Sequence, residues 1–514
     1  MKIALIYVEA DSWALGPRTV SAVLKNAGHN TKVILMGTEE HSFSQEALAE
    51  AKKLCTDVDL IGVSSFSRGS EKAKQIIQAL KPLNKLIVWG GVHATLCPEE
   101  CMMVADLVCR GEGEHFMLEL VERLERHQGW EDIANGAYFA NGNMVTNALR
   151  PLIDKLDELP LPDYERTGEY RLERHGFKLA EASLVSEAAI MFTGSRGCAF
   201  HCNYCSNAKL KKLYGGNRRY VRKMSIRRYA EQAAALREVF PEARSFYLVD
   251  EDLMARSVEE LREFAEEFPA KVGLPFECMA SPPMVTEEKM KLLVKAGLWR
   301  IDLGVESGSE RTKREVFNRH ISNAAVIRAA KIINRYSQVV PYYFFIIGNP
   351  YESKDDLLET INLIQQLPAP FHLRTYNLVF LPGSLLYDMA VMDGLIKGKQ
   401  DCGFEIDFLA GLDFKGYAWK EKELYLNGLV FLMSGRNTRW KAGMLPRFLL
   451  KSLTRSRCVE YNSVRPAFIK AMIRAQMAAT KLRRLLLIAL RSVIKDPRRL
   501  YRVDVRPAPG TVKG

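Results

Sequence analysis

Short β-rich runs alternate with stretches of helical period over about the first 125 residues. The β-rich runs are 3–8, 31–35, 60–64, 86–89 and 107–109. Such alternation predicts a Rossmann-like, doubly wound parallel sheet. Ligands of such sheets bind at the carboxyl ends of the strands, where this chain has loops rich in small residues. We therefore predict an α/β domain over residues 1–150 with a ligand site along one edge of its sheet.

The alternation resumes after a proline-containing segment. The later strand candidates are 189–193, 245–250, 276–279, 300–305, 342–347 and 373–379. Six strand-helix units predict a partial or complete β/α barrel over residues 186–385, with its chemistry at the carboxyl ends of the strands. We expect residues 151–185 to be a linker. Residues 386–514 are expected to form a helical, basic C-terminal region, because the strand signal fades there.

The positive charge of the chain is concentrated in that last region. The formal net charge is +12, yet 20 lysines and arginines face only three acids from Arg436 onward. The basic C-terminal helices are interpreted in three ways: a cap on the barrel with a solvated face, a peripheral contact with an anionic membrane, or a nucleic-acid surface. Few aromatic residues interleave the charges of the last helix, 466–495, so nucleic acid is the least favoured partner.

The chain has neither a candidate spanning segment nor an export signal. No apolar run approaches the roughly 20 residues that a spanning helix needs. The N-terminus lacks the basic segment, apolar run and cleavage site of a signal peptide. We therefore expect a cytoplasmic protein that associates with a membrane, if it does so, only peripherally.

Three of the ten cysteines form a tight group. Cys198, Cys202 and Cys205 make a C-x3-C-x2-C loop directly after the first predicted barrel strand. Three soft thiolates this close can hold one face of an iron–sulfur cubane, leaving one iron open to substrate. The alternatives are a zinc site or buried thiols. Structural zinc needs a fourth ligand, and His201 is adjacent to Cys202, where the loop could hardly turn it inward. We predict a single cluster.

This loop, with Tyr204 just before the last cysteine, resembles the signature of the radical SAM superfamily. The resemblance implies a [4Fe–4S] cluster whose open iron chelates S-adenosylmethionine (SAM). One-electron reduction then cleaves SAM to a 5′-deoxyadenosyl radical. It also implies an electron donor of the flavodoxin or ferredoxin type.

Later segments resemble the SAM-contacting parts of the same family. Glu306 and Ser307 lie in a fourth-strand segment near the ribose and methionine of SAM, and Gly348 begins the sixth-strand segment near the adenine. Asp250 ends the second strand. Alone, these residues would be a surface carboxylate, a turn and a helix cap. Their joint order after the cysteine loop favours the SAM site, with Tyr204 as a further expected contact.

The N-terminal domain resembles the cobalamin (B12)-binding domains that precede many radical SAM domains. The likeness lies mainly in segments 89–95 and 109–114. The residues that resemble those around the corrin tail are Trp13, Gly16, Ser64, Phe66, Gly90 and Gly91. Trp13 stands where a cobalt-ligating histidine would be, and its side chain can only donate an N–H. Cobalamin is therefore expected to bind without a histidine ligand; the alternative is a fold kept without its cofactor.

These features predict a radical SAM enzyme of the subgroup with an N-terminal cobalamin domain. We expect a cobalamin-dependent C-methyltransferase that acts on an unactivated carbon. The alternatives are a non-methylating radical SAM cyclase or rearrangement enzyme and, from another class, a nucleic-acid- or membrane-binding protein with a structural cluster. The substrate is expected to be a small or lipid-like molecule, and the sequence does not identify it.

Overall fold

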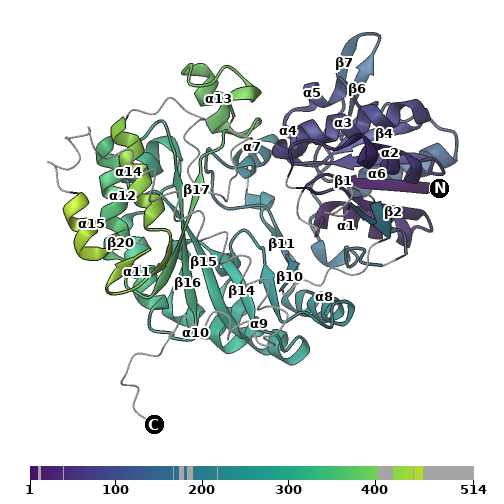
Figure 1. Cartoon of the computed structure of the whole chain (residues 1–514). Coiled ribbons are helices and arrows are strands. Elements are labelled where there is room, and N and C mark those ends of the chain that lie inside the picture. Colours follow the sequence, from purple (N-terminus) through teal and green to yellow (C-terminus); the bar gives the residue numbers. More distant parts are fainter. Residues whose placement is uncertain are drawn as a thin grey trace.

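The computed structural model describes residues 1–9, 13–38, 40–165, 167–172, 179–181, 189–216, 218–402, 421–443 and 445–454. These residues form two large sheets with helices packed around them, side by side (Figure 1). No helix in this part of the chain is long and apolar enough to cross a membrane. Residues 455–514, which include the expected helices of 466–495, lie outside the described residues.

The first sheet contains the five strands expected from the sequence. The strand order is β7-β6-β5-β4-β3-β1-β2-β8-β9. The bounds are β1 (Lys2–Tyr7), β2 (Asn30–Leu35), β3 (Leu60–Ser64), β4 (Leu86–Gly90), β5 (Leu107–Cys109), β6 (Gly136–Ala140), β7 (Asn143–Thr146), β8 (Glu169–Leu172) and β9 (Leu179–Glu181). Strands β1 to β5 run parallel. This confirms the predicted doubly wound sheet.

Helices cover both faces of this sheet. They are α1 (Leu15–Asn26), α2 (Gln45–Leu54), α3 (Ser70–Leu80), α4 (Val92–Leu96), α5 (Pro98–Met102) and α6 (Glu114–Glu125). Along β1, Ile3 and Leu5 pack in a core with α1 and α6, whereas Ala4 and Ile6 pack with α2 and α3. Because both faces are buried, the strands are continuous apolar runs. The order reverses between β1 and β3, which is where a ligand of such a sheet binds.

Part of the expected linker belongs to this domain. Strand β8 pairs in parallel with β2, and β9 pairs with β8. Glu169 of β8 forms a 2.7 Å ion pair with buried Arg18 of α1. Arg18 also donates to the carbonyl of Asp163 at 2.8 Å. The expectation of a simple linker over 151–185 is therefore incomplete, since this segment also forms strands β8 and β9 at one end of the sheet. Its polar sequence gave no strand pattern.

The second sheet contains the six parallel strands of the predicted barrel. The order is β10-β13-β14-β15-β16-β17, extended by β18-β19-β20. The bounds are β10 (Ala189–Phe192), β13 (Ser245–Leu248), β14 (Phe276–Ala280), β15 (Leu298–Glu306), β16 (Val340–Ile347), β17 (Phe371–Asn377), β18 (Gly435–Asn437), β19 (Lys441–Ala442) and β20 (Leu445–Pro446). This is a partial barrel. The last three short strands are antiparallel and were not expected.

The helices of this part of the chain are α7 (Ser206–Leu213), α8 (Ile226–Val239), α9 (Val258–Lys271), α10 (Glu287–Ala296), α11 (Asn323–Ile333), α12 (Lys354–Gln366), α13 (Leu385–Met392), α14 (Glu421–Leu432) and α15 (Arg447–Leu453). Helices α8 to α12, α14 and α15 share one hydrophobic core with the sheet, whereas α7 contacts α4 and α13 packs in a separate cluster. A two-stranded hairpin of β11 (Ser195–Arg196) and β12 (Arg222–Lys223) lies beside the first barrel strand. Both the cysteine loop and α7 are inserted between the two strands of this hairpin.

Candidate functional site

The cysteine loop begins where β10 ends, at the edge of the barrel that carries its chemistry. Gly197 has φ +83°, and a Cβ there would lie 2.3 Å from the carbonyl oxygen of Tyr220. A Cβ on Gly194 would overlap the ring of Tyr229. Only glycine fits at either position, so the backbone can turn tightly just before the first cysteine.

The three cysteines of the loop lie close enough to interact. Cys202 is buried, Cys198 and Cys205 are half-buried, and the amide of Cys205 donates to the carbonyl of Cys202 at 3.0 Å. Electrostatic interactions join all three sulfurs. Among the described residues, no group of three His, Cys, Asp or Glu side chains is placed to hold a single metal ion. A cubane fits this arrangement, because each thiolate binds a different iron and the sulfurs need not converge on one point.

Burial controls the protonation of two of these thiols. It raises the pKa of Cys198 to about 12 and that of Cys205 to about 11. These two thiols therefore hold their protons at neutral pH until metal replaces them.

Arg319, which the sequence analysis did not single out, connects the cysteine loop to β15. Its Nη1 donates to Cys202 Sγ at 3.4 Å, and its Nη2 donates to the carbonyl of Gly304 at 2.8 Å. The guanidinium also lies 5.2 Å over the ring of Phe200. Its Nε is buried without a hydrogen-bond partner among the described residues. An N–H in that situation is available to an anionic ligand bound beside the cluster loop.

Glu306 and Tyr204 also lie beside Arg319. Glu306 has φ +71°, an unusual conformation for a residue with a side chain. Burial raises the pKa of Glu306, while Arg319 and a hydrogen bond from Tyr204 act in the opposite direction. The structure thus brings Cys202, Tyr204 and Glu306 together around one guanidinium.

A cavity of about 590 Å³ lies between the two domains. Among the residues that line it on the first domain are five of the expected cobalamin positions, namely Gly16, Ser64, Phe66, Gly90 and Gly91. On the barrel side it reaches residues 193–197, directly before Cys198, and also Glu251. Leu156 and Leu159 of the expected linker form part of its wall. The carboxyl edges of both sheets therefore face one space.

The glycines on the first domain fit a large ligand held against backbone. Gly91 has φ +95°, and a Cβ there would lie 2.8 Å from the carbonyl of Ser65. A Cβ on Gly16 would project into open space. A doubly wound sheet with a backbone cradle at its switch point has the shape that the cobalamin expectation requires.

Trp13, the remaining expected cobalamin residue, does not line this cavity. Its ring is 4% exposed and packs edge-on against Phe240 at 5.3 Å and Tyr164 at 5.9 Å between centroids. The tryptophan thus packs in the hydrophobic core between the domains. Its position in the loop motif does not show which way its large apolar ring turns, and its role toward cobalamin stays a prediction.

Comparison with known proteins agrees with this geometry. Residues 192–364 match the family model of the radical SAM superfamily, and residues 1–121 match that of the B12 binding domain. The chain belongs to the radical SAM superfamily. It carries a B12-binding domain ahead of the radical SAM domain, and its cofactors are a [4Fe–4S] cluster, SAM and cobalamin. It is a radical SAM enzyme, which confirms the resemblance seen in the sequence.

Two curated relatives and one solved structure show the range of similar proteins. An uncharacterized methyltransferase of Pyrococcus horikoshii is 27% identical over 72% of this chain and 76% of its own length. An anaerobic magnesium-protoporphyrin IX monomethyl ester cyclase of Cereibacter sphaeroides is 25% identical over 66% of this chain, which spans about half (54%) of that relative. The radical SAM methyltransferase TsrM of Kitasatospora setae has a similar fold, with a TM-score of 0.61 and 13% identity over 76% of this chain and 78% of its own.

The expected SAM residues of the radical SAM domain fall into two groups. Ser307 and Gly348 are held by the protein itself: Ser307 Oγ donates to Glu352 at 2.8 Å, and the amide of Gly348 donates to Asn427 at 2.9 Å. Asp250 accepts a 2.8 Å bond from Tyr229, whereas its second oxygen is buried without a partner among the described residues. Asp250 also lines a small cavity beside Cys198.

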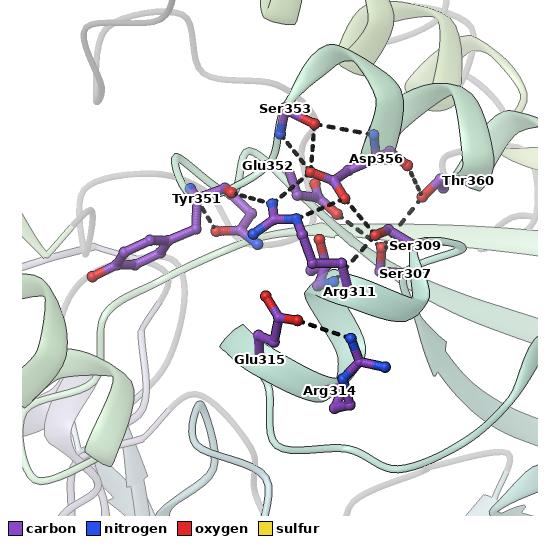
Figure 2. Close-up of polar contacts among 12 residues, drawn as sticks. Ser307, Ser309, Arg311, Arg314, Glu315, Tyr351, Glu352, Ser353, Asp356 and Thr360 are labelled. Atoms are coloured by element: carbon purple, nitrogen blue, oxygen red, sulfur yellow. Dashed lines mark hydrogen bonds and ion pairs between the residues drawn. The ribbon is translucent and has the colours of Figure 1, made fainter.

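A polar network locks the two SAM segments together (Figure 2). The amide of Gly308 donates to Thr360 of α12 at 2.8 Å, and Arg311 donates to the carbonyl of Tyr351 at 2.8 Å. Asp356 accepts from Arg311 and Ser309, and it also caps α12. A Cβ on Gly308 would lie 2.3 Å from the Thr360 backbone. The network therefore fixes the loop after Glu306 against the helix that follows β16.

This network predicts a pH dependence of stability. Burial raises the pKa of Glu352 to about 8 from 4.5. The protonated carboxyl therefore stabilises the fold fully below about pH 4.5, and this contribution is lost as pH rises through about 8. Between about pH 5 and pH 9 the free energy of unfolding should fall more for wild type than for Glu352→Gln, as measured by urea denaturation. Glu359→Gln, on the exposed face of α12, should behave as wild type. Equal slopes for all three proteins would contradict the assignment.

Proposed function

We propose that this chain is a cobalamin-dependent C-methyltransferase acting on an unactivated carbon of a small-molecule substrate. The observation that carries the proposal is the single cavity shared by the carboxyl edges of both sheets. When bound, the cluster and SAM supply a 5′-deoxyadenosyl radical, and cobalamin supplies a methyl group. A substrate between them would meet both cofactors without leaving the cavity.

The protein's own residues orient and shield these groups. Cys198, Cys202 and Cys205 hold the cluster. The Nε of Arg319, which has no partner in the described part of the chain, offers a donor to the carboxylate of SAM. Tyr204, Asp250 and Glu306 are the proposed SAM contacts, with Ser307 and Gly348 fixing the loops around it. Gly16, Ser64, Phe66, Gly90 and Gly91 form the proposed cobalamin site. The apolar linker wall excludes water from the cavity.

The relatives support methyl transfer and keep one alternative open. The Pyrococcus relative and the TsrM structure are named as methyltransferases. Other relatives are cyclases, so a non-methylating radical reaction is the second candidate. It would use the same cluster and SAM residues but would not consume methyl groups.

The test is a comparison of products from anaerobically purified protein. Wild type should contain about four iron atoms and about one cobalt per chain, and with SAM, reductant and methylcobalamin it should form 5′-deoxyadenosine and S-adenosylhomocysteine. Cys202→Ala should lose the iron and both products, while Cys278→Ala, a buried cysteine of β14, should keep them. Formation of 5′-deoxyadenosine alone, without cobalt, would favour the non-methylating alternative; zinc without SAM cleavage would refute both.

We also propose that an acidic electron carrier of the flavodoxin or ferredoxin type docks at α7. Residues 206–223 contain seven lysines and arginines and no acid. The exposed side chains there and on the cluster loop include His201, Lys212 and Leu213. Lys211 ties the helix to the cluster loop by donating to the carbonyl of Ala199 at 3.3 Å. Lys209, Arg222 and Lys223 are ion-paired to acids elsewhere in the fold, so exposed Lys212, next to Leu213, is the cation that would meet an acidic donor.

Reversing one charge on this surface should distinguish reduction by a protein donor from reduction by a chemical reductant. With flavodoxin at low salt, Lys212→Glu should slow 5′-deoxyadenosine formation by about tenfold, because electrostatic steering is lost. With dithionite the rate should stay unchanged. Lys291→Glu, an exposed site on α10, is the control and should be normal with both reductants. Equal rates of Lys212→Glu and wild type with flavodoxin would place the donor elsewhere.

We propose a second contact, with an anionic membrane at the cytoplasmic face, through the C-terminal region. Trp440 and Phe448 are 77% and 79% exposed. They are neighbours, because the amide of Arg447 donates to the carbonyl of Trp440 at 3.2 Å. Residues 434–454 contain five lysines and arginines and no acid, and the basic sequence continues to the end of the chain. Exposed aromatic rings among cations are typical of a surface that inserts shallowly into lipid.

Vesicle binding tests this contact. Wild type should sediment with phosphatidylglycerol vesicles and not with phosphatidylcholine vesicles. The double variant Trp440→Ala/Phe448→Ala should bind at least about fivefold more weakly, because its buried apolar area is lost. Met392→Ala, which removes an equally exposed apolar side chain on α13, should bind as wild type. Undiminished binding of the double variant would rule out this patch.

A further inference from the structure

The loop after β5 of the first domain is ion-paired to the hairpin that carries the cysteine loop. Glu112 accepts from Arg196 Nη1 at 2.9 Å and from Arg222 Nη1 at 2.8 Å. Its second oxygen accepts from the amide of Ile153 at 2.7 Å. Arg196 also pairs with Glu114 at 2.5 Å. Arg196 and Arg222 face each other across β11 and β12, and Arg196 lies two residues before Cys198.

This ion-pair cluster is largely withdrawn from solvent. The side chains of Glu114 and Arg222 are 4% and 5% exposed, and those of Glu112 and Arg196 are 17% and 27% exposed. Burial opposes ionisation of Glu112, yet Arg196 and Arg222 outweigh it and hold the pKa of that carboxyl below its usual range. Removing one charge would leave its partner unpaired in a buried site, which is costly. The four side chains therefore act as one unit.

A continuous chain of bonds joins this cluster to the proposed cobalamin cradle. Thr95 Oγ1 donates to the carbonyl of Gly91 at 2.8 Å, and the amide of Gly111 donates to Thr95 Oγ1 at 2.9 Å. Gly111 is followed directly by Glu112, which holds Arg196. Two hydrogen bonds and one ion pair therefore connect the Gly91 backbone to Arg196, which lies two residues before Cys198.

We propose that Glu112 and Glu114 are positioning residues through which the cobalamin domain sets the geometry of the cluster loop. Arg196 connects the two sites, since it contacts both carboxylates and lies two residues before Cys198, the first cluster ligand. Occupancy of the cobalamin site then changes the environment of the cluster. This inference rests on the proposed function only in naming cobalamin as the occupant.

The experiment compares cluster spectra of full-length proteins with and without cobalamin. In wild type, adding cobalamin to cobalamin-free, iron-loaded protein should shift the electron paramagnetic resonance signal of the reduced cluster. In Glu112→Gln, which keeps shape and removes charge, the shift should disappear, and 5′-deoxyadenosine formation with dithionite should fall about tenfold at unchanged iron content. Glu112→Asp, which keeps the charge, should restore part of the shift.

The control removes a different ion pair between the same regions. Lys399 pairs with Glu71 at 3.2 Å and with Glu100, away from the cysteine loop. Lys399→Met should keep the wild-type shift and rate. A full shift in Glu112→Gln, or an equal loss in Lys399→Met, would overturn the inference. Should wild type bind no cobalamin, the proposed function fails, while a spectrum of Glu112→Gln that differs from wild type would still support the positioning role.

Discussion

The structure depends on a geometric constraint of parallel sheets, which is that all their strands end at the same edge. Here two such edges face each other across one cavity, so the start of α1 and the loops after β3 and β4 meet the loop after β10. Neither sheet alone could enclose a ligand on all sides. The glycines let the backbone approach a ligand at these edges, and the ion pairs between the domains keep the two edges facing each other.

The sequence predicted those parts of the fold that local physics determines. Strands buried on both faces need unbroken apolar runs, so β1, β3 and β16 could be located from residue type alone. The cysteine loop could be found because its chemistry requires three thiols at fixed spacing. Short strands such as β8 and β18 carry no such pattern, since they have only four and three residues and lie near polar sequence. Their existence depends on tertiary pairing that one sequence does not display.

The site residues divide in the same way. Glu306 was found because it lies in a recognisable segment, whereas Arg319 reaches Cys202 only through the fold and leaves no local signal. Trp13, an expected cobalamin residue, lies outside the cavity lining, because its large apolar ring packs against Phe240 and Tyr164. Its role toward cobalamin stays a prediction. Position in a motif therefore predicted proximity to the site better than it predicted side-chain direction.

Carboxylates near the site differ in charge because their partners differ. Glu352 lies deep beside Ser307, and burial raises its pKa, whereas Arg311 holds the pKa of Asp356 well below its usual range. Glu112 stays ionised despite burial because two guanidinium groups surround it. A neutral carboxyl can hold a loop without attracting cations, whereas an ionised one joins elements of opposite charge. Glu352 is therefore neutral and Asp356 ionised within the radical SAM domain, whereas Glu112 is ionised at the domain boundary, where its ion pairs give orientation as well as contact.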